Sequence, residues 1–445
     1  MKPARTSIES IHASENADGK LPSKEVLSPP EYEMSQRSKV CGVDIHKQFF
    51  VAALLSQVGE STIKRFQSDR SGLLEFKDWV LNEQCELVAL ESTGVYWYSL
   101  YSTLEDHIEV IVANPYFIKN IPGRKTDIAD AQWIAQLALN DLIKPSRVFP
   151  KKQREIRNLT RSREHLVNNR TMLKNRVHRI LESASIKLSS VLSDIFGKSG
   201  LHIVQGLLAG TDLDTIIASI PNEKIRLKEP ELRNAVQHNL ESSQILIIDQ
   251  CLSLMEQITR RIDELDEEID ARMIDRKKDL KIATSIPGIG KVSAITILAE
   301  IGSYEEFITP EKLAAGSGLI HSVYQSADHL KTGPITKRGS PHLRRIMVEV
   351  AQAAVKTKNS RLRSFFLKLK MKNGYIKAIV AVARKILCIL WTILKKQELY
   401  CEENLPRKKV SMSLKATPHP RAIQDAIEIP GRAGYVIKKL DSSGG

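Results

Sequence analysis

The first predicted elements are three strands, indicated by short apolar runs. Residues 40–45 and 49–56 are almost continuously apolar on either side of a tight connection, and residues 61–68 form a third run with charged positions. Runs of this length bounded by polar residues indicate strands of a sheet. A helix is predicted over residues 71–83, where apolar residues between Leu73 and Val80 recur at helical spacing.

Strands and helices then alternate as far as residue 140. A strand is predicted over residues 85–92, a helix over 94–106, a strand over 108–114 and a last helix from Asp127 to about Asn140. Three strands followed by helix, strand, helix, strand and helix is the order found in α/β domains of the ribonuclease H and RuvC type. We therefore predict an α/β ribonuclease H/RuvC-like N-terminal domain over residues 39–185.

The next segment, residues 186–279, predicts a helical linker that contains a coiled coil. Seven apolar residues in it recur in alternating steps of three and four, which forms a heptad seam of about three repeats. They are Ile248, Cys251, Met255, Ile258, Ile262, Leu265 and Ile269. Such a seam pairs with another helix of the same chain or with a second subunit, and the sequence leaves both open.

Residues 280–401 predict a mainly α C-terminal domain that opens with two helices around the turn Pro287–Gly290. Glycines there let backbone N–H groups face a DNA phosphate, as in a helix-hairpin-helix motif, and Lys291 adds a cation. An ordinary turn between packed helices explains the same pattern. Residues 1–38 and 402–445 are polar and aperiodic, and they predict a flexible extension and a flexible tail.

The positive net charge indicates a polyanionic partner. The chain has 66 Lys and Arg against 52 Asp and Glu, a formal charge of +14. From Lys151 to Arg179 there are ten cations against two acids, and from Lys331 to Lys372 twelve against Glu349 alone. Two separate basic segments favour nucleic acid, although one such run is usually a solvated helix face.

The five cysteines are scattered and form no zinc-ligand spacing, which favours a reducing compartment. The most apolar late run, Ile386–Leu394, is too short to span a bilayer. We therefore expect a cytoplasmic protein with no membrane partner.

Four acids are candidates for a metal site. Asp44 lies in the first predicted strand, Glu91 ends a later one, and Asp127 and Asp130 begin the last helix on one face. In the predicted topology these positions share one edge of the sheet, where two divalent cations would neutralise the acids and polarise a phosphodiester. For Asp127 and Asp130, capping of the helix is the competing interpretation. We interpret His46 as structural.

Several motifs in fixed order resemble those of the DEDD-type transposases of bacterial and archaeal insertion sequences. They include VDIHK, ESTGVYW, PGRKTDIADAQW, IPGIG and GLIHSVYQSADHLKTGPITKRGSPHLRR. The resemblance covers about Val40 to Tyr400, and the family's best-studied members are described as bridge-RNA-guided serine recombinases.

The resemblance implies a RuvC-like domain in which Asp44, Glu91, Asp127 and Asp130 bind two Mg²⁺ ions. It also implies a C-terminal transposase domain with a nucleophilic serine, which carries over to Ser326, although Ser317 and Ser322 lie close by. Acids and serine would form a composite site across subunits of a homo-oligomer, a dimer or tetramer, and act on DNA at the element ends and target. The resemblance further implies a structured guide RNA.

The candidate nucleic-acid ligands come from three places. These are the two basic residues ahead of Asp127, which are placed to meet the phosphate at the acid site, the two basic segments, and the glycine turn with the lysine after it. They are Arg124, Lys125, Arg161, Arg163, Arg170, Lys174, Arg176, Gly288, Gly290, Lys291, Lys337, Arg338, Arg344 and Arg345.

The leading hypothesis is a DNA transposase or recombinase. A structure-specific nuclease of the Holliday-junction resolvase type would use the same acids to activate water. A non-enzymatic nucleic-acid-binding or assembly protein would use them only as caps.

Overall fold

The computed structural model describes residues 37–92, 94–118, 126–237, 239–326, 329–337 and 339–402. The predicted extension and tail therefore lie almost wholly outside the described residues, as do Arg124, Lys125 and Arg338. The chain divides into two compact units at Phe149/Pro150. The predicted end of the first domain at residue 185 lies in the second unit, two residues after the end of the helix Lys151–Ser183.

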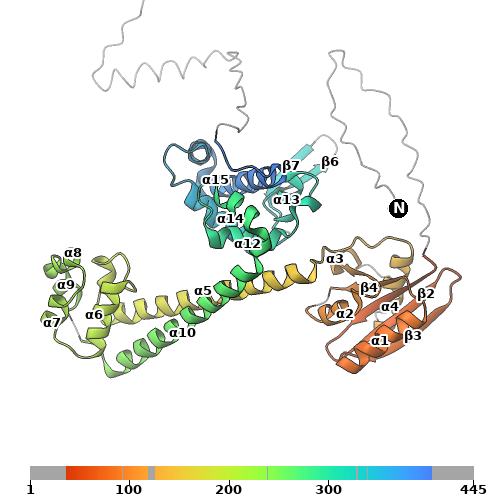
Figure 1. The fold of residues 1–445 in the computed structure, drawn as a ribbon, viewed down its shortest axis with the longest axis horizontal. Coiled ribbons are helices and arrows are strands. Elements are labelled where there is room, and N and C mark those ends of the chain that lie inside the picture. Colours follow the sequence, from red (N-terminus) through yellow and green to blue (C-terminus); the bar gives the residue numbers. More distant parts are fainter. Residues whose placement is uncertain are drawn as a thin grey trace, which may run out of the picture. The chain divides into compact units, whose positions relative to one another are not determined.

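The first unit is built on a mixed sheet of five strands in the order β3-β2-β1-β4-β5 (Figure 1). β1 pairs antiparallel with β2 and parallel with β4. The strands are β1 Lys39–Ile45, β2 Phe49–Ser56, β3 Ser61–Gln67, β4 Leu87–Glu91 and β5 Glu109–Ala113. The predicted α/β character of this part is confirmed, because each predicted strand and helix is present.

Helices cover both faces of this sheet. One core packs β-strand residues against α1 and α2, and it contains the stacked and edge-on rings of Phe50, Phe66 and Phe76. On the opposite face, α4 packs on β1 and β2 through Ala131 and Ala135. The helices are α1 Arg70–Asn82, α2 Trp97–Leu104, α3 Pro115–Ile118 and α4 Asp127–Leu139.

The second unit begins with α5 Lys151–Ser183, which runs antiparallel to α10 Ser242–Arg272 (Figure 1). Antiparallel pairing follows from the side-chain contacts Arg163–Asp266 and Arg170–Thr259, in which one residue number rises as the other falls. The heptad seam thus has a partner helix in the same chain. The coiled-coil geometry itself stays a prediction.

A small helical subdomain lies between α5 and α10, in a region where the sequence shows no motif. Its short helices share an apolar core with the adjoining ends of α5 and α10. They are η1 Leu188–Ser190, α6 Lys198–Leu208, α7 Leu213–Ala218, α8 Glu223–Arg226 and α9 Glu229–Ala235.

The remaining elements form the largest core of the protein, which confirms the prediction of a mainly helical C-terminal part. The run Ile386–Leu394 lies within it as part of α15. No helix among the described residues has the length and apolar content to cross a bilayer. The helices are η2 Ile274–Arg276, α11 Lys277–Thr284, α12 Lys291–Ile301, η3 Tyr304–Glu306, α13 Pro310–Gly316, α14 Pro341–Ala354 and α15 Arg361–Lys396.

A β-hairpin interrupts these helices where the sequence analysis expects mostly helix. It consists of β6 His321–Ser326 and β7 His329–Ile335, paired antiparallel. Two short runs separated by two residues are typical of a hairpin, and Val323, Tyr324 and Thr332 are residues that favour strands. Ser326 is the last residue of β6, and its backbone pairs with that of His329.

Candidate metal centre and the residues around it

Asp44 lies near the end of β1, on the sheet face that α4 covers. Val40 and Gly42 share this face, while Cys41, Val43 and Ile45 pack in the core beside α1 and α2. The β1–β4 register pairs Val43 with Leu90. Because side chains alternate between the faces, Glu91 at the end of β4 comes level with Asp44 on the same face.

Gly42 allows the backbone of α4 to approach β1. A Cβ atom at Gly42 would lie 2.2 Å from the amide nitrogen of Ala135 and 2.4 Å from the carbonyl oxygen of Ala131. Only a residue without a Cβ tolerates so close a backbone, so the glycine fixes how near α4 lies to the strand. It thereby fixes how near Asp127 and Asp130 lie to Asp44.

The N-terminus of α4 is capped by Thr126 rather than by either aspartate. Thr126 has extended backbone angles, and its hydroxyl oxygen accepts a hydrogen bond from the Ala129 N–H at 3.2 Å. Asp127 and Asp130 lie in the first turn, where the helix dipole favours negative charge. Since the cap is already made, the two carboxylates are available for another role.

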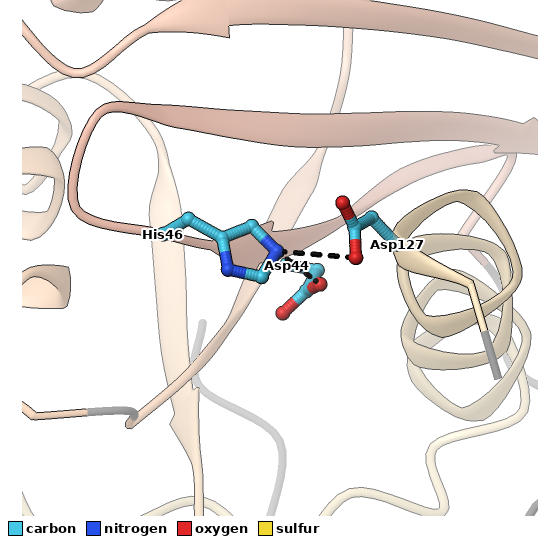
Figure 2. Close-up of side chains that lie close together, drawn as sticks. All are labelled: Asp44, His46 and Asp127. Atoms are coloured by element: carbon cyan, nitrogen blue, oxygen red, sulfur yellow. Dashed lines mark ion pairs between the residues drawn. The ribbon is translucent and has the colours of Figure 1, made fainter.

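Asp44, His46 and Asp127 offer one ligand atom each, and these atoms lie within 4.8 Å of one another. Figure 2 shows the imidazole of His46 directed at both carboxylates, with Nε2 3.2 Å from Asp44 Oδ2 and 3.3 Å from Asp127 Oδ1. The Asp44 side chain is 10% exposed and that of Asp127 47%. The group is therefore buried on the strand side and open on the helix side.

Glu91 and Asp130 lie outside that close group but act on it electrostatically. Burial raises the pKa of Asp44, and the charges of Glu91, Asp130 and Asp127 raise it further, whereas His46 lowers it. A raised pKa means that the folded protein disfavours the Asp44 carboxylate. The cluster therefore carries negative charge that a bound cation would relieve.

His46 is the residue whose position the sequence analysis misses. Its Nε2 is buried and makes no hydrogen bond of acceptable geometry, despite the two carboxylates close to it. A signal was available in the sequence, because His46 follows Asp44 by two positions, directly after the end of β1. Continued alternation of the strand would place the two side chains on one face.

We predict that Gly42→Ala will separate α4 from β1, because the new methyl group meets backbone atoms that cannot rotate away. The expected loss is about 1–3 kcal/mol in the free energy of unfolding of the first unit, typical of overpacking. Any stabilisation of the protein by divalent cations should fall as well. Both are measured by urea unfolding with and without Mg²⁺ or Mn²⁺.

The matched control for this substitution is Gly197→Ala, since a Cβ there meets no atom closer than 3.5 Å. If divalent cations stabilise Gly42→Ala as much as the wild type, the close packing of α4 on β1 is not what positions the carboxylate cluster.

The three candidate serines differ in their surroundings. Ser317 is fully buried, and its hydroxyl donates to the Ala314 carbonyl at 2.7 Å. The Ser322 hydroxyl donates to the Pro334 carbonyl at 3.2 Å. Ser326 ends β6, and its side chain lies outside what the structure describes.

The candidate cations of α5 are mostly engaged within the protein. Arg161 binds the Glu300 carboxylate through Nε at 2.7 Å, and Arg163 binds Asp266. Arg170 donates to the Thr259 hydroxyl, and the Lys174 ammonium lies 4.9 Å from the Phe196 ring centroid. Arg176 is exposed.

The candidate cations after α5 are likewise mostly engaged within the protein. Lys291 binds Asp270 at 2.5 Å, and Arg344 donates to the carbonyl groups of Ser317 and Gly339. Arg345 forms ion pairs with Glu164 and Glu349, whereas Lys337 is exposed.

The two turn glycines have different surroundings. Gly288 has φ +90°, and a Cβ there would lie 2.6 Å from the Ala354 amide nitrogen, so it is needed for packing against α14. Gly290 is the N-cap of α12, and a Cβ there meets nothing within 4 Å.

Two family comparisons agree with this geometry. Residues 41–186 match the DEDD-type IS110 transposase family, and residues 280–367 match the family described as "Transposase IS116/IS110/IS902 family". The first match contains all four candidate acids, and the second contains Ser326.

Curated relatives resemble the chain over most of its length. A transposase for insertion sequence element IS1111A from Coxiella burnetii is 24% identical, over 81% of this chain and 91% of the relative. A transposase for IS1328 from Yersinia enterocolitica is 20% identical over 79% and 95%, and a pilin gene-inverting protein from Moraxella bovis 24% over 80% and 95%.

The predicted family is thus confirmed by two matches in the expected order, with the candidate acids in the first. The chain belongs to the DEDD-type insertion-sequence transposases, enzymes that act on DNA.

Proposed function

We propose that this transposase cleaves and rejoins DNA with a metal site formed by Asp44, Glu91, Asp127 and Asp130 in a ribonuclease H/RuvC-like domain, and with Ser326 as nucleophile. The observation that carries the proposal is the convergence of four acids from three separate elements at one sheet edge, one of them buried with a raised pKa. Structural caps alone give no reason for that convergence.

The donor set fits a divalent cation. Carboxylate oxygens are the ligands that Mg²⁺ prefers, and the His46 Nε2 without a hydrogen bond adds a nitrogen that Mn²⁺ also accepts. We assign two Mg²⁺ ions, held by the four acids. When bound, they would polarise the phosphodiester and stabilise the charge that develops on its oxygens.

The serine assignment rests on elimination as well as on the resemblance. Ser317 is buried and hydrogen-bonded, and Ser322 is bonded to the opposite strand of the hairpin. In the proposed reaction, Ser326 Oγ attacks phosphorus, and one DNA strand leaves as a free hydroxyl. A hydroxyl of another strand then attacks the serine ester, which restores a phosphodiester and releases the serine.

Rejoining distinguishes this reaction from hydrolysis. The ester conserves the energy of the phosphodiester bond, so exchange of strands needs no ATP. Two relatives are named pilin gene-inverting proteins, and inversion requires that cut ends be joined again. This supports recombination rather than simple cutting by a resolvase-type nuclease.

Ser326→Ala tests the choice between them. We expect the variant to bind element-end DNA and Mg²⁺ normally but to form no covalent protein–DNA adduct and no joined product. The adduct is detected as a band of reduced mobility after denaturation. A nuclease that activates water would keep cutting without the serine, so retained cleavage by Ser326→Ala would overturn the nucleophile assignment. Ser322→Ala, in the same strand, is the matched control.

The partners that we propose are DNA at the element ends and target, a structured guide RNA, and further copies of the chain in a homo-oligomer. Exposed Arg176 and Lys337 remain candidate phosphate ligands. Gly290 and Lys291, at the exposed N-terminus of α12, keep the helix-hairpin-helix interpretation as a proposal. RNA guidance predicts that purified protein carries a defined RNA, which sequencing of co-purified nucleic acid would detect.

A further inference from the structure

α15 consists of two helical segments joined at an exposed elbow. Gly374 separates them, with φ +77° and ψ 172°, a conformation that is essentially restricted to glycine. Every residue from Lys370 to Lys377 is exposed, whereas the second segment is buried from Ala378 onward at helical spacing. Core packing therefore gives no reason for the side chains at the elbow.

The elbow is strongly basic. From Arg361 to Lys385 the sequence holds eight Lys and Arg and no acid. The exposed lysines among them are Lys368, Lys370, Lys372 and Lys377. No ion pair or hydrogen bond of these four side chains is found among the described residues. This contrasts with Arg161, Arg163, Lys291 and Arg345, whose charges are matched by carboxylates of the same chain.

Large apolar side chains lie among these lysines. Met371 is 87% exposed, Ile376 77% and Tyr375 48%. The Tyr375 ring meets the buried Phe366 ring edge to face, with centroids 5.6 Å apart, so it is held in position while half of its surface stays accessible. Exposed apolar side chains that lie together, with one of them held in position, are a feature of binding surfaces.

We propose that the α15 elbow, residues 367–377, binds a single-stranded stretch of nucleic acid. The lysines would contact phosphates, and Tyr375 with Ile376 would stack on or pack against unpaired bases. A duplex hides the faces of its bases, so the apolar groups favour a single strand. A second copy of the same surface is disfavoured, because the four lysines of one elbow would face four of the other. This inference rests on the proposed function in assuming that the enzyme handles opened DNA or RNA.

The test uses the full chain in EDTA, so that binding is measured without cleavage. The probes are oligo(dT), oligo(rU) and a mixed-sequence DNA duplex of equal length, each followed by fluorescence anisotropy over a range of salt. Tyr375→Ala should weaken single-strand binding about 5- to 150-fold, the contribution of one stacked base, and change duplex binding little. Comparison of oligo(dT) with oligo(rU) identifies which strand the elbow prefers.

The charge contribution is tested separately. Lys372→Gln with Lys377→Gln should reduce the slope of log K against log salt by about 1.4 for the single strand, about 0.7 for each lost phosphate contact. The matched control is Lys277→Gln with Lys278→Gln, two exposed lysines of α11 in the same unit, which should leave the slope unchanged.

Because Tyr375 packs on Phe366, Ile376→Ser provides a second variant that removes no core contact, and it should also weaken single-strand binding. Equal losses with single strand and duplex, or no loss in either variant, would overturn the proposal. Failure of the proposed function is a different result, namely metal-dependent cleavage that survives Ser326→Ala, and it is read in a separate assay.

Discussion

Asp44→Asn is expected to abolish metal-dependent DNA cleavage, with a loss of about a thousandfold or more. The substitution keeps the shape of the side chain but removes the charge at the most buried ligand of the cluster. Metal stabilisation of developing charge contributes several kcal/mol to such reactions, and each 1.4 kcal/mol is a factor of ten. Cleavage of a labelled element-end duplex in Mg²⁺ or Mn²⁺ measures the effect.

The stability of Asp44→Asn, measured with and without cation, shows whether Asp44 is a metal ligand or a structural acid. The folded protein disfavours the Asp44 carboxylate, because burial and three neighbouring acids raise its pKa. In EDTA, Asp44→Asn should therefore be at least as stable as the wild type. The wild type should gain about 2.7 kcal/mol when the cation is at a hundred times its dissociation constant, and the variant should gain far less.

Asp106→Asn is the control, since Asp106 is an exposed acid of the same unit. It should leave both cleavage and the cation response unchanged. If Asp44→Asn instead lowers stability in EDTA and cuts DNA at the wild-type rate, Asp44 is a structural residue and the metal assignment is wrong.

The convergence of the acids could be predicted, because it depends on the alternation of side chains along a strand and on the order of strands and helices in the chain. Alternation along a strand puts Asp44 and Glu91 on one face, and a first-turn position puts Asp127 and Asp130 at one end of α4. The distance between them was not predictable. It depends on the backbone of α4 lying against Gly42, a contact between residues about ninety positions apart that no local pattern encodes.

The partners of the ion pairs could not be predicted from the sequence either. The basic run of α5 suggests a phosphate-binding face, yet Arg163 faces Asp266 on α10 and Arg161 faces Glu300 on α12. A local count of cations ignores acids that the fold brings in from distant segments. Within the part of the chain that the structure describes, the lysines of the α15 elbow meet no such acid. The fold therefore makes them stronger candidates for phosphate contacts than the paired arginines of α5.

Glu300→Gln is expected to destabilise the second unit by about 3–5 kcal/mol, the cost of breaking a buried ion pair from one side. The Glu300 side chain is fully buried, and it binds Arg157 at 3.1 Å and Arg161 at 2.7 Å. It also accepts a hydrogen bond from the Ser340 hydroxyl at 2.7 Å. The variant would remove the negative charge that Glu300 supplies to two mostly buried guanidinium groups. Urea unfolding measures the loss.

The effect should depend on pH in a defined direction. Burial raises the pKa of Glu300, but the hydrogen bond from Arg161, the charge of Arg157 and the Ser340 hydroxyl outweigh it and lower the pKa to about 2. A folded pKa below the unfolded value of about 4.3 means that the stabilisation is complete above pH 5 and disappears as the pH falls toward 2. The difference in stability between wild type and Glu300→Gln should therefore shrink between pH 5 and pH 2.

Glu267→Gln is the matched control, because Glu267 is exposed on α10 and should change stability by no more than about 0.5 kcal/mol. A difference in stability between wild type and Glu300→Gln that stays constant down to pH 2 would contradict the charged network.

The ion pairs of Glu300 also affect which cations can bind nucleic acid. A DNA phosphate that bound Arg161 would have to displace the Glu300 carboxylate, which would then be buried with less positive charge around it. Arg161→Gln should therefore lower the free energy of unfolding and leave the salt dependence of DNA binding close to that of the wild type.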